Sequence, residues 1–160
     1  MFEDKEAFLA AMLSSNSLHH PWVEPPATPQ AFDDYWKRFQ QPNQKSYLVC
    51  DELDTIFGVF NVNEIVRGAF QSAFLGFYGI KDYTGKGYMR AGLKLVQKKV
   101  FETLGLHRLE ANIQPENTRS IQLGCVYNSS PMPTCRGLSA ASRLSKSTTN
   151  IIIQITPIWV

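Results

Sequence analysis

The sequence predicts an α/β domain in which a mixed sheet is flanked by helices. Two amphipathic helical patterns come before the first strand, and runs rich in β-branched and aromatic residues follow them. Between residues 73 and 113 a strand, a glycine-rich turn, a helix and another strand then succeed one another. A crossover of this kind favours neighbouring strands of one sheet with a right-handed connection, which makes the class mixed α/β.

The two helices are expected at residues 4–13 and from residue 28 to Phe39. The first has an acidic first turn ahead of apolar positions at helical spacing. Residues 19–26 contain three prolines and are expected to form a loop. Thr28 followed by Pro29 is typical of a helix start, with a capping side chain and then proline at the first helical position.

Four strands are expected, and the first two form a hairpin. Residues 46–50 and 55–62 are rich in β-branched and aromatic side chains and flank a polar turn at residues 51–54. Cys50 lies in the first strand and is expected to be buried. Residues 73–80 and 108–113 are the third and fourth strands. The helix between them has an apolar face and ends at Gly105; that face consists of Met89, Leu93, Val96, Val100 and Leu104.

Length and composition favour one globular domain with a small anionic ligand. A chain of 160 residues that is 44% hydrophobic and 12% aromatic can bury one core. The formal net charge of +2 is too small to indicate nucleic acid or an anionic membrane as partner. No apolar run approaches the roughly 18 residues of a membrane span, and the acidic N-terminus is unlike a signal peptide.

The cysteines indicate a reducing, cytoplasmic setting. Cys50, Cys125 and Cys135 are an odd number and show no C-x-x-C spacing, so neither a disulfide framework nor a metal site is expected.

The glycine-rich turn at residues 83–87 is the first candidate for chemistry. Gly85, Lys86 and Gly87 lie between a predicted strand and a predicted helix, where glycine lets backbone N–H groups approach an anion at the positive end of the helix dipole. Lys86 adds a charge for phosphate. A purely structural turn is the alternative. The turn is neither a P-loop nor a Rossmann fingerprint, since it lacks a G-K-[ST] ending and a third glycine.

Five blocks of sequence resemble a known family. They are His-Pro-Trp at residues 20–22 and the segments at residues 76–80, 83–89, 105–111 and 115–121. Through them residues 4–123 resemble the GNAT acetyltransferases, particularly the branch that includes the ribosomal-protein-alanine N-acetyltransferases. The resemblance implies a GNAT-like, mixed and mostly antiparallel sheet flanked by helices. The family's first strand and C-terminal hairpin are expected to be missing or altered.

The resemblance implies acetyl-CoA as co-substrate and an amine, either a protein N-terminus or a small molecule, as acceptor. The amine would attack the thioester directly. The pantetheine arm would lie along the backbone of Tyr78, Gly79 and Ile80. The pyrophosphate would be bound by the loop and the helix start, namely by Thr84, Gly85, Lys86, Gly87, Tyr88 and Met89.

The resemblance also implies catalytic roles. Asn117 would hold the cofactor arm and Ser120 would donate a proton to the leaving thiolate, although helix capping explains both residues equally well. Glu110 is the candidate base, directly or through water, because strand alternation places it away from the apolar face; a solvated or salt-bridged carboxylate is the alternative. His20 and Trp22, with the adjacent His19, are candidates for the acceptor pocket, and merely polar loop histidines are the alternative.

The chain departs from the family's pattern in several places, among them the cofactor loop and the C-terminal tail. Asp82 stands where the cofactor-loop pattern usually has glutamine or arginine, and its charge would repel phosphate unless it points away. All 14 acidic residues lie between Glu3 and Glu116, and residues 124–160 contain none while serine and threonine become dense. We therefore expect a truncated acetyltransferase domain over residues 1–123 and an atypical tail over residues 124–160. Residues 151–155 could form a terminal strand.

The family's Gly-Phe pair and final hairpin are not recognisable in the tail. This loss of the family pattern motivates the hypothesis that the tail is out of frame. Besides an N-acetyltransferase, two alternatives stay open: an inactive acetyl-CoA-binding module, and a fragment that persists by homo-oligomerising.

Overall fold

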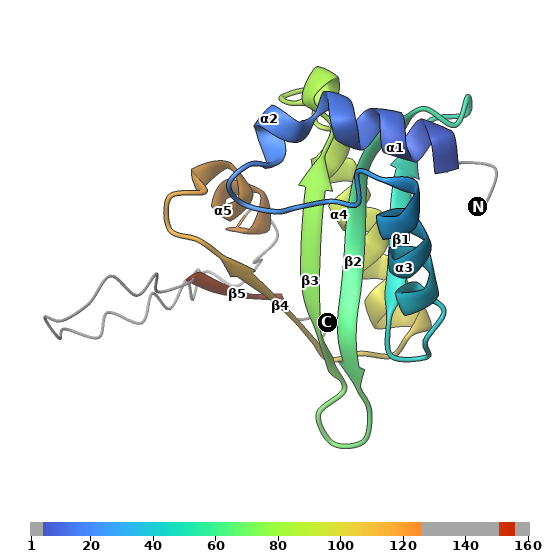
Figure 1. Cartoon of the computed structure of the whole chain (residues 1–160). Coiled ribbons are helices and arrows are strands. Elements are labelled where there is room, and N and C mark those ends of the chain that lie inside the picture. The colour runs from blue at the N-terminus through green and yellow to red at the C-terminus, as the bar shows by residue number, and fades with distance from the viewer. Residues whose placement is uncertain (1–4, 126–150, 156–160) are drawn as a thin grey trace, which may run out of the picture.

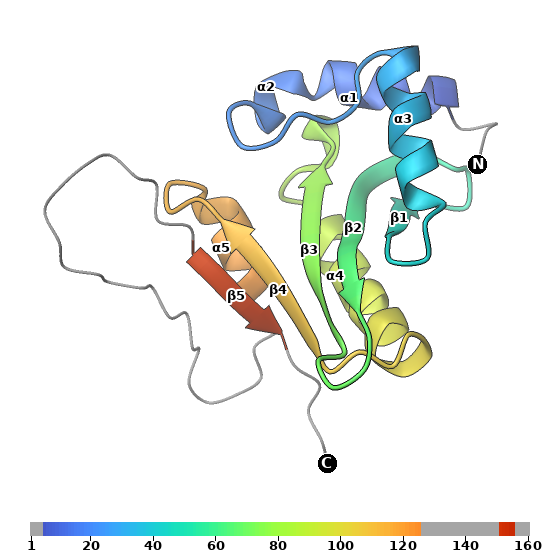
Figure 2. The same ribbon diagram turned by 60° about the horizontal axis from the view of Figure 1, so that its bottom comes forward.

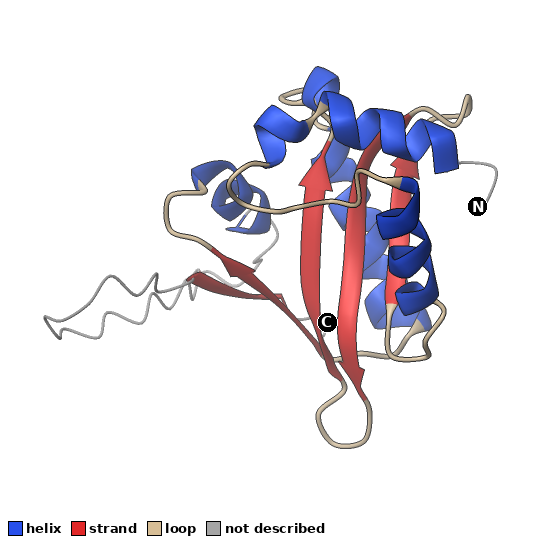
Figure 3. Ribbon diagram, in the orientation of Figure 1, coloured by secondary structure: helices blue, strands red, loops and turns tan. Residues whose placement is uncertain are grey.

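The computed structural model describes residues 5–125 and the backbone of residues 151–155. Helices lie on both faces of one sheet, as expected for a mixed α/β domain (Figures 1 and 3). The elements in chain order are α1 (Lys5–Ser14), α2 (Asn16–His19), α3 (Pro29–Phe39), β1 (Lys45–Cys50), β2 (Ile56–Val66), β3 (Ser72–Gly79), the 3-10 turn η1 (Lys81–Tyr83), α4 (Tyr88–Lys98), the π-helical turn η2 (Lys99–Thr103), β4 (Arg108–Ile113), α5 (Thr118–Cys125) and β5 (Ile151–Ile155).

The strand order is β1-β2-β3-β4-β5. All neighbouring pairs are antiparallel except β3 and β4, which are parallel. The predicted hairpin of β1 and β2, the crossover through α4 and the mixed, mostly antiparallel sheet are therefore confirmed. β5 pairs with β4 from Leu109 to Ile113, so a strand lies at the position of the expected terminal strand and covers that edge of β4. Residues 1–4, where the family's first strand was sought, lie outside the described residues.

Two apolar clusters hold the layers together. Between the sheet and α4 the cluster includes Phe60, Val62, Leu93, Val100 and Leu109, all fully buried. On the other face α1 and α3 cover a second cluster, which includes Phe8, Met12, Phe32, Val59 and Tyr78. Burial of such side chains, worth about 1.5–3 kcal/mol each, is what fixes the helices on the sheet.

The helix ends follow the local signals. Thr28 caps α3, since its Oγ1 accepts a hydrogen bond of 3.2 Å from the Ala31 N–H, and Pro29 occupies the first position as predicted. Gly105 has a φ of +64°, as expected of a glycine that stops a helix. The predicted helix to Leu104 changes to a π-helical turn at Lys99, where the Leu104 N–H donates to the Lys99 carbonyl.

Three sequence predictions need correction. The loop expected from residue 19 begins one residue later, because the His19 N–H bonds the Ser15 carbonyl at 3.1 Å and closes a last helical turn. β2 continues past residue 62 to Val66, because its pairing with β3 extends that far. Cys50 is exposed, since the register between β1 and β2 shifts at this residue, next to the turn that connects the two strands.

Among the described residues, no three side chains of metal-binding type gather in one place. No helix in the same part of the chain is both long enough and apolar enough to span a membrane.

Candidate functional site

The central feature of the site is a split in the sheet. β3 and β4 pair only over Ser72–Phe74, opposite Arg108–Glu110, whereas β3 runs on to Gly79 and keeps its pairing with β2 along that length. The two strands diverge from this short parallel contact (Figure 2). One edge of β3 from Leu75 to Gly79 therefore has no neighbouring strand among the described residues.

The register determines which peptide groups of β3 face the split. The Ile80 N–H donates to the Phe57 carbonyl at 3.0 Å. Because hydrogen-bonded and non-bonded pairs alternate in an antiparallel ladder, Tyr78 also directs its peptide groups toward β2. Those of Phe77 and Gly79 point the other way, into the split. Of the three residues predicted along the pantetheine arm, Gly79 thus has the peptide groups turned toward the gap.

The glycine-rich loop lies between η1 and α4, at the end of β3 (Figure 1). Gly85 and Gly87 have φ angles of +77° and +86°, which L side chains rarely adopt, and open space surrounds both. Within the described residues, the N–H groups of Gly85, Lys86 and Gly87 donate to no acceptor. The Thr84 N–H, in contrast, donates to the Lys81 carbonyl at 3.2 Å.

Side-chain packing fixes the start of α4 against the sheet. Tyr88 stacks on Phe57 with ring centroids 4.0 Å apart. A Cβ on Gly58 or Gly79 would lie 2.2 Å and 3.2 Å, respectively, from the Met89 side chain, so Met89 fills the space that these two glycines leave. The first N–H groups of α4 are therefore held beside the end of β3, where they present the positive end of the helix dipole.

The charges near the loop have both signs. Lys86 is exposed, and its Nζ lies 5.2 Å from the centre of the Tyr83 ring. Lys81 and Asp82 in η1 are exposed as well. Two ammonium groups and one carboxylate leave a net positive charge beside the free N–H groups, which suits a multiply charged anion.

Asn117 and Ser120 lie at the start of α5, beyond the end of β4. The Ser120 N–H donates to Asn117 Oδ1 at 3.2 Å, so the capping arrangement is present. Both side chains are partly exposed and remain within reach of a ligand. Helix α5 and strand β4 lie across the split from β3 (Figure 2).

Glu110 lies on the sheet face opposite α4. Its neighbours Leu109 and Ala111 belong to the cluster under α4, and side chains alternate along a strand. The Glu110 carboxylate is ion-paired with Arg108, whose Nε lies 2.9 Å from Oε1, and the side chain is only 16% exposed. A salt-bridged Glu110 carboxylate was the alternative that the sequence left open, and this is the form observed.

His20 and Trp22 lie in the loop that follows α2. His20 is exposed and Trp22 is partly buried. The Trp22 N–H donates to the His19 carbonyl at 2.7 Å, so the loop is tied to the end of α2. His19, which the sequence placed beside His20 in the candidate acceptor pocket, is 2% exposed, and its Nε2 lies 2.8 Å from the Gly79 carbonyl oxygen.

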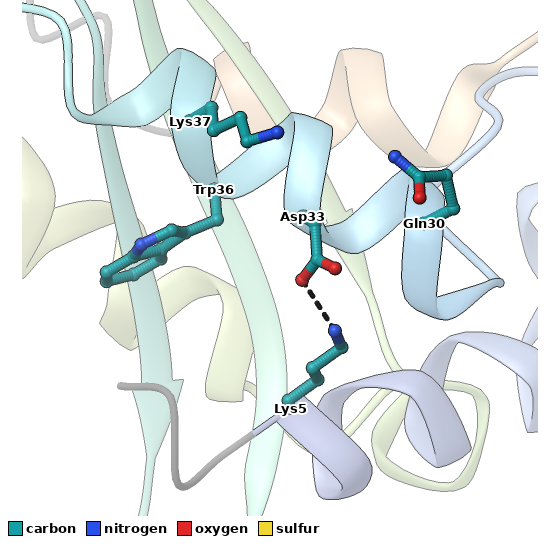
Figure 4. A pocket seen from close by; sticks show the side chains of 5 residues that line it. All are labelled: Lys5, Gln30, Asp33, Trp36 and Lys37. Atoms are coloured by element: carbon teal, nitrogen blue, oxygen red, sulfur yellow. Dashed lines mark hydrogen bonds and ion pairs between the residues drawn. The ribbon is translucent and has the colours of Figure 1, made fainter.

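A surface pocket elsewhere lies between α1 and α3, where Lys5 and Asp33 form an ion pair (Figure 4). Gln30, Trp36 and Lys37 complete its lining. None of the predicted site residues belongs to this pocket.

A sheet that splits beside a glycine-rich helix start defines the GNAT class of acetyltransferase fold. Residues 2–124 match the model of the family described as Acetyltransferase (GNAT) domain, and the chain belongs to this family.

Two curated relatives support this membership. The chain is 39% identical over 91 residues to the probable N-acetyltransferase YjcK of Bacillus subtilis (strain 168), a match that covers 56% of this chain and 50% of the relative. It is 37% identical over 65 residues to the [ribosomal protein uS5]-alanine N-acetyltransferase of Escherichia coli (strain K12), covering 41% and 34%. The chain thus spans half or less of the length of these relatives.

Among solved structures, RimJ of Mycobacterium smegmatis in complex with CoA-disulfide superimposes with a TM-score of 0.79. The match covers 98% of this chain and 78% of RimJ at 19% sequence identity, so the two proteins share the fold.

Proposed function

We propose that this chain is an N-acetyltransferase that transfers the acetyl group of acetyl-CoA to an amine by direct attack. The observation that supports it best is the set of free N–H groups at Gly85, Lys86 and Gly87, next to the unpaired edge of β3. A helix start with free N–H groups binds phosphate. A strand edge with unpaired peptide groups binds an extended amide chain such as pantetheine.

The site residues fit this cofactor. Gly85, Lys86 and Gly87 with the first turn of α4, at Tyr88 and Met89, would hold the pyrophosphate. Gly79 would bind the arm through its N–H, while Tyr78 and Ile80 fix the strand against β2. Acetyl-CoA, when bound, supplies an activated thioester.

The polar side chains across the split would assist transfer. Asn117 would position the arm, and the Ser120 hydroxyl would give a proton to the leaving sulfur. Glu110, directly or through a water molecule, would take the proton from the attacking amine. The acceptor, a protein N-terminus or a small amine, would lie near His20 and Trp22. We propose a cytoplasmic setting for this activity, which the cysteine pattern supports.

One observation favours a second candidate function, an acetyl-CoA-binding module without transfer. The Glu110 carboxylate is ion-paired with Arg108, whose Nε lies 2.9 Å from Oε1, so the candidate base is directed at a cation of the protein itself. The third possibility, a fragment that binds nothing and persists as an oligomer, predicts no response to acetyl-CoA.

Thermal denaturation with and without acetyl-CoA separates binder from fragment, because a ligand at 100 times its Kd stabilises the native state by about 2.7 kcal/mol. Acetyl transfer to a panel of N-terminal peptides and small amines then separates enzyme from binder. Ser120→Ala and Glu110→Gln should slow transfer, while Thr118→Ala and Glu116→Gln, exposed neighbours of similar chemistry, should not. Absence of stabilisation by acetyl-CoA would overturn the proposal.

We also propose that residues 1–123 form the acetyltransferase domain and that residues 124–160 are an out-of-frame tail. The family match, which ends at residue 124, and the complete loss of acidic residues after Glu116 support this division. Translation of the encoding DNA in the other two frames tests it. If neither frame gives a continuation with the Gly-Phe pair, the tail is not a frameshift product.

A further inference from the structure

Two buried polar side chains bind the backbone at the end of β3. Ser15 is 0% exposed and His19 is 2% exposed, and the two residues are one helical turn apart where α1 meets α2. Ser15 Oγ accepts a hydrogen bond of 3.0 Å from the Lys81 N–H, and His19 Nε2 lies 2.8 Å from the Gly79 carbonyl oxygen. Helices α1 and α2 thus lie across the end of the strand that borders the split (Figure 1).

The carbonyl oxygen of Gly79 determines the tautomer of the His19 ring. A carbonyl oxygen can only accept, so Nε2 must bear the proton and donate it to Gly79. In the neutral ring Nδ1 is then an acceptor, and within the described residues this buried atom has no partner. An unpaired buried nitrogen costs folding free energy. The bond from Nε2 to the Gly79 carbonyl is the one side-chain hydrogen bond that His19 makes within the described residues.

His19 also binds the loop at residues 20–26, called the acceptor loop because it bears the candidate acceptor-pocket residues His20 and Trp22. The His19 carbonyl accepts the N–H of Trp22 at 2.7 Å and the N–H of Val23 at 3.0 Å. Its ring packs edge-on against Tyr78, with centroids 5.4 Å apart. His19 therefore connects the backbone of the loop at residues 20–26 with the strand whose peptide groups face the split.

We propose that Ser15 and His19 form a positioning clamp that fixes the acceptor loop relative to the cofactor-binding end of β3. The proposal rests on the proposed function. The Gly79 carbonyl faces the split. His19 binds this carbonyl and so sets the orientation of the adjoining peptide plane. Cofactor binding at β3 is thereby transmitted to the loop that bears His20 and Trp22. The clamp touches no reacting atom.

Three variants test the clamp. His19→Leu removes the donor, His19→Gln retains an N–H donor at a similar reach, and Gln44→Leu is the control, a buried polar side chain that bonds Glu64 outside the proposed site. We expect His19→Leu to lower kcat/KM for the acceptor at least about tenfold, since small misplacements of reactants are costly in rate. Acetyl-CoA affinity should change less than about threefold, because the N–H groups of the loop at residues 85–87 are untouched. His19→Gln should recover most of the loss, and Gln44→Leu should lose stability without this change in kcat/KM.

Amide hydrogen exchange provides the second readout. In the wild type, acetyl-CoA should increase protection of Trp22 and Val23, and His19→Leu should abolish that increase. Unchanged kcat/KM in His19→Leu, or a failure of His19→Gln to recover activity, would overturn the clamp. An inactive wild type that still shows the coupled protection would overturn the proposed transfer but retain the clamp. No protection of the loop in the wild type would overturn the clamp alone if transfer occurs, and an absence of acetyl-CoA binding would overturn both.

Discussion

Replacing Gly87 by alanine tests the assignment of the cofactor loop most directly. Gly87 has a φ of +86°, and no atom lies within 4 Å of the position that a Cβ would take. The substitution therefore introduces no clash, and its cost is the backbone conformation alone. A left-handed conformation costs an L residue about 1–2 kcal/mol. With about 2–4 °C per kcal/mol for a chain of this size, the melting temperature should fall by about 2–8 °C.

Gly68 provides a matched control. It has a φ of +72° and equally open surroundings, so Gly68→Ala should lose similar stability. It lies in the connection between β2 and β3, at the opposite end of β3 from the loop (Figure 1). The length of Ser72–Gly79 separates the two sites by roughly 23 Å at 3.3 Å per residue.

Only Gly87→Ala should weaken binding. If the backbone at residue 87 relaxes, at least one N–H turns away from the pyrophosphate, and a hydrogen bond to a charged group is worth about 1.5–3 kcal/mol. The Kd for acetyl-CoA should rise about 10- to 150-fold. Isothermal titration calorimetry with both variants measures it. Equal affinities of Gly87→Ala and Gly68→Ala for acetyl-CoA would refute the reasoning.

Three further predictions concern stability. Thr28→Ala removes the cap that accepts from Ala31 and should cost about 1 kcal/mol in urea denaturation; an unchanged midpoint would contradict the capping role. Gly92→Ala should destabilise by about 1–3 kcal/mol even though alanine is the better helix former, because the new Cβ would lie 2.4 Å from Val49 Cγ2. The double variant with Val49→Ala should relieve this crowding, and no relief would locate the cost elsewhere. Burial raises the pKa of Tyr78, whose hydroxyl lies near Tyr35 and Asn61 but makes no hydrogen bond of ordinary geometry within the described residues. A raised pKa gives stability that is complete below about pH 10, the value of an unfolded tyrosine, and is lost above it. Tyr78→Phe should raise the unfolding free energy by about 1 kcal/mol at pH 7 and flatten the decline above pH 10; an identical alkaline decline would contradict this.

The elements could be predicted from the sequence where local chemistry determines them. Thr28 and Pro29 mark a helix start that depends only on the first turn, and Gly105 marks an end that depends on one φ angle. The apolar spacing of Leu93, Val96 and Val100 gave the crossover helix, because burial of one face is what a 3.6-residue period produces. These signals act within a few residues.

The arrangement of the site could not be predicted in the same way. The split is a property of two strands, Ser72–Gly79 and Arg108–Ile113, and its extent depends on where their pairing stops. The bond from His19 to Gly79 joins residues 60 apart, and no local pattern distinguishes His19 from the exposed His20 beside it. The signal available in the sequence was a serine and a histidine one helical turn apart. Only the burial of both side chains in the structure makes this signal meaningful.

In the proposed function, the two faces of the sheet would separate the two reactants. The N–H groups at Gly85–Gly87 precede α4, which packs on one face, whereas Glu110 lies on the face opposite α4. The peptide edge of Gly79 lies between these faces, within the split. An amine that approaches from the side of Glu110 would therefore reach a thioester held in the split without displacing the pyrophosphate from the loop. Among the described strands, the two faces are joined where β3 and β4 separate. Transfer would therefore depend on how firmly the end of β3 is held, and the bonds of Ser15 and His19 act at that point.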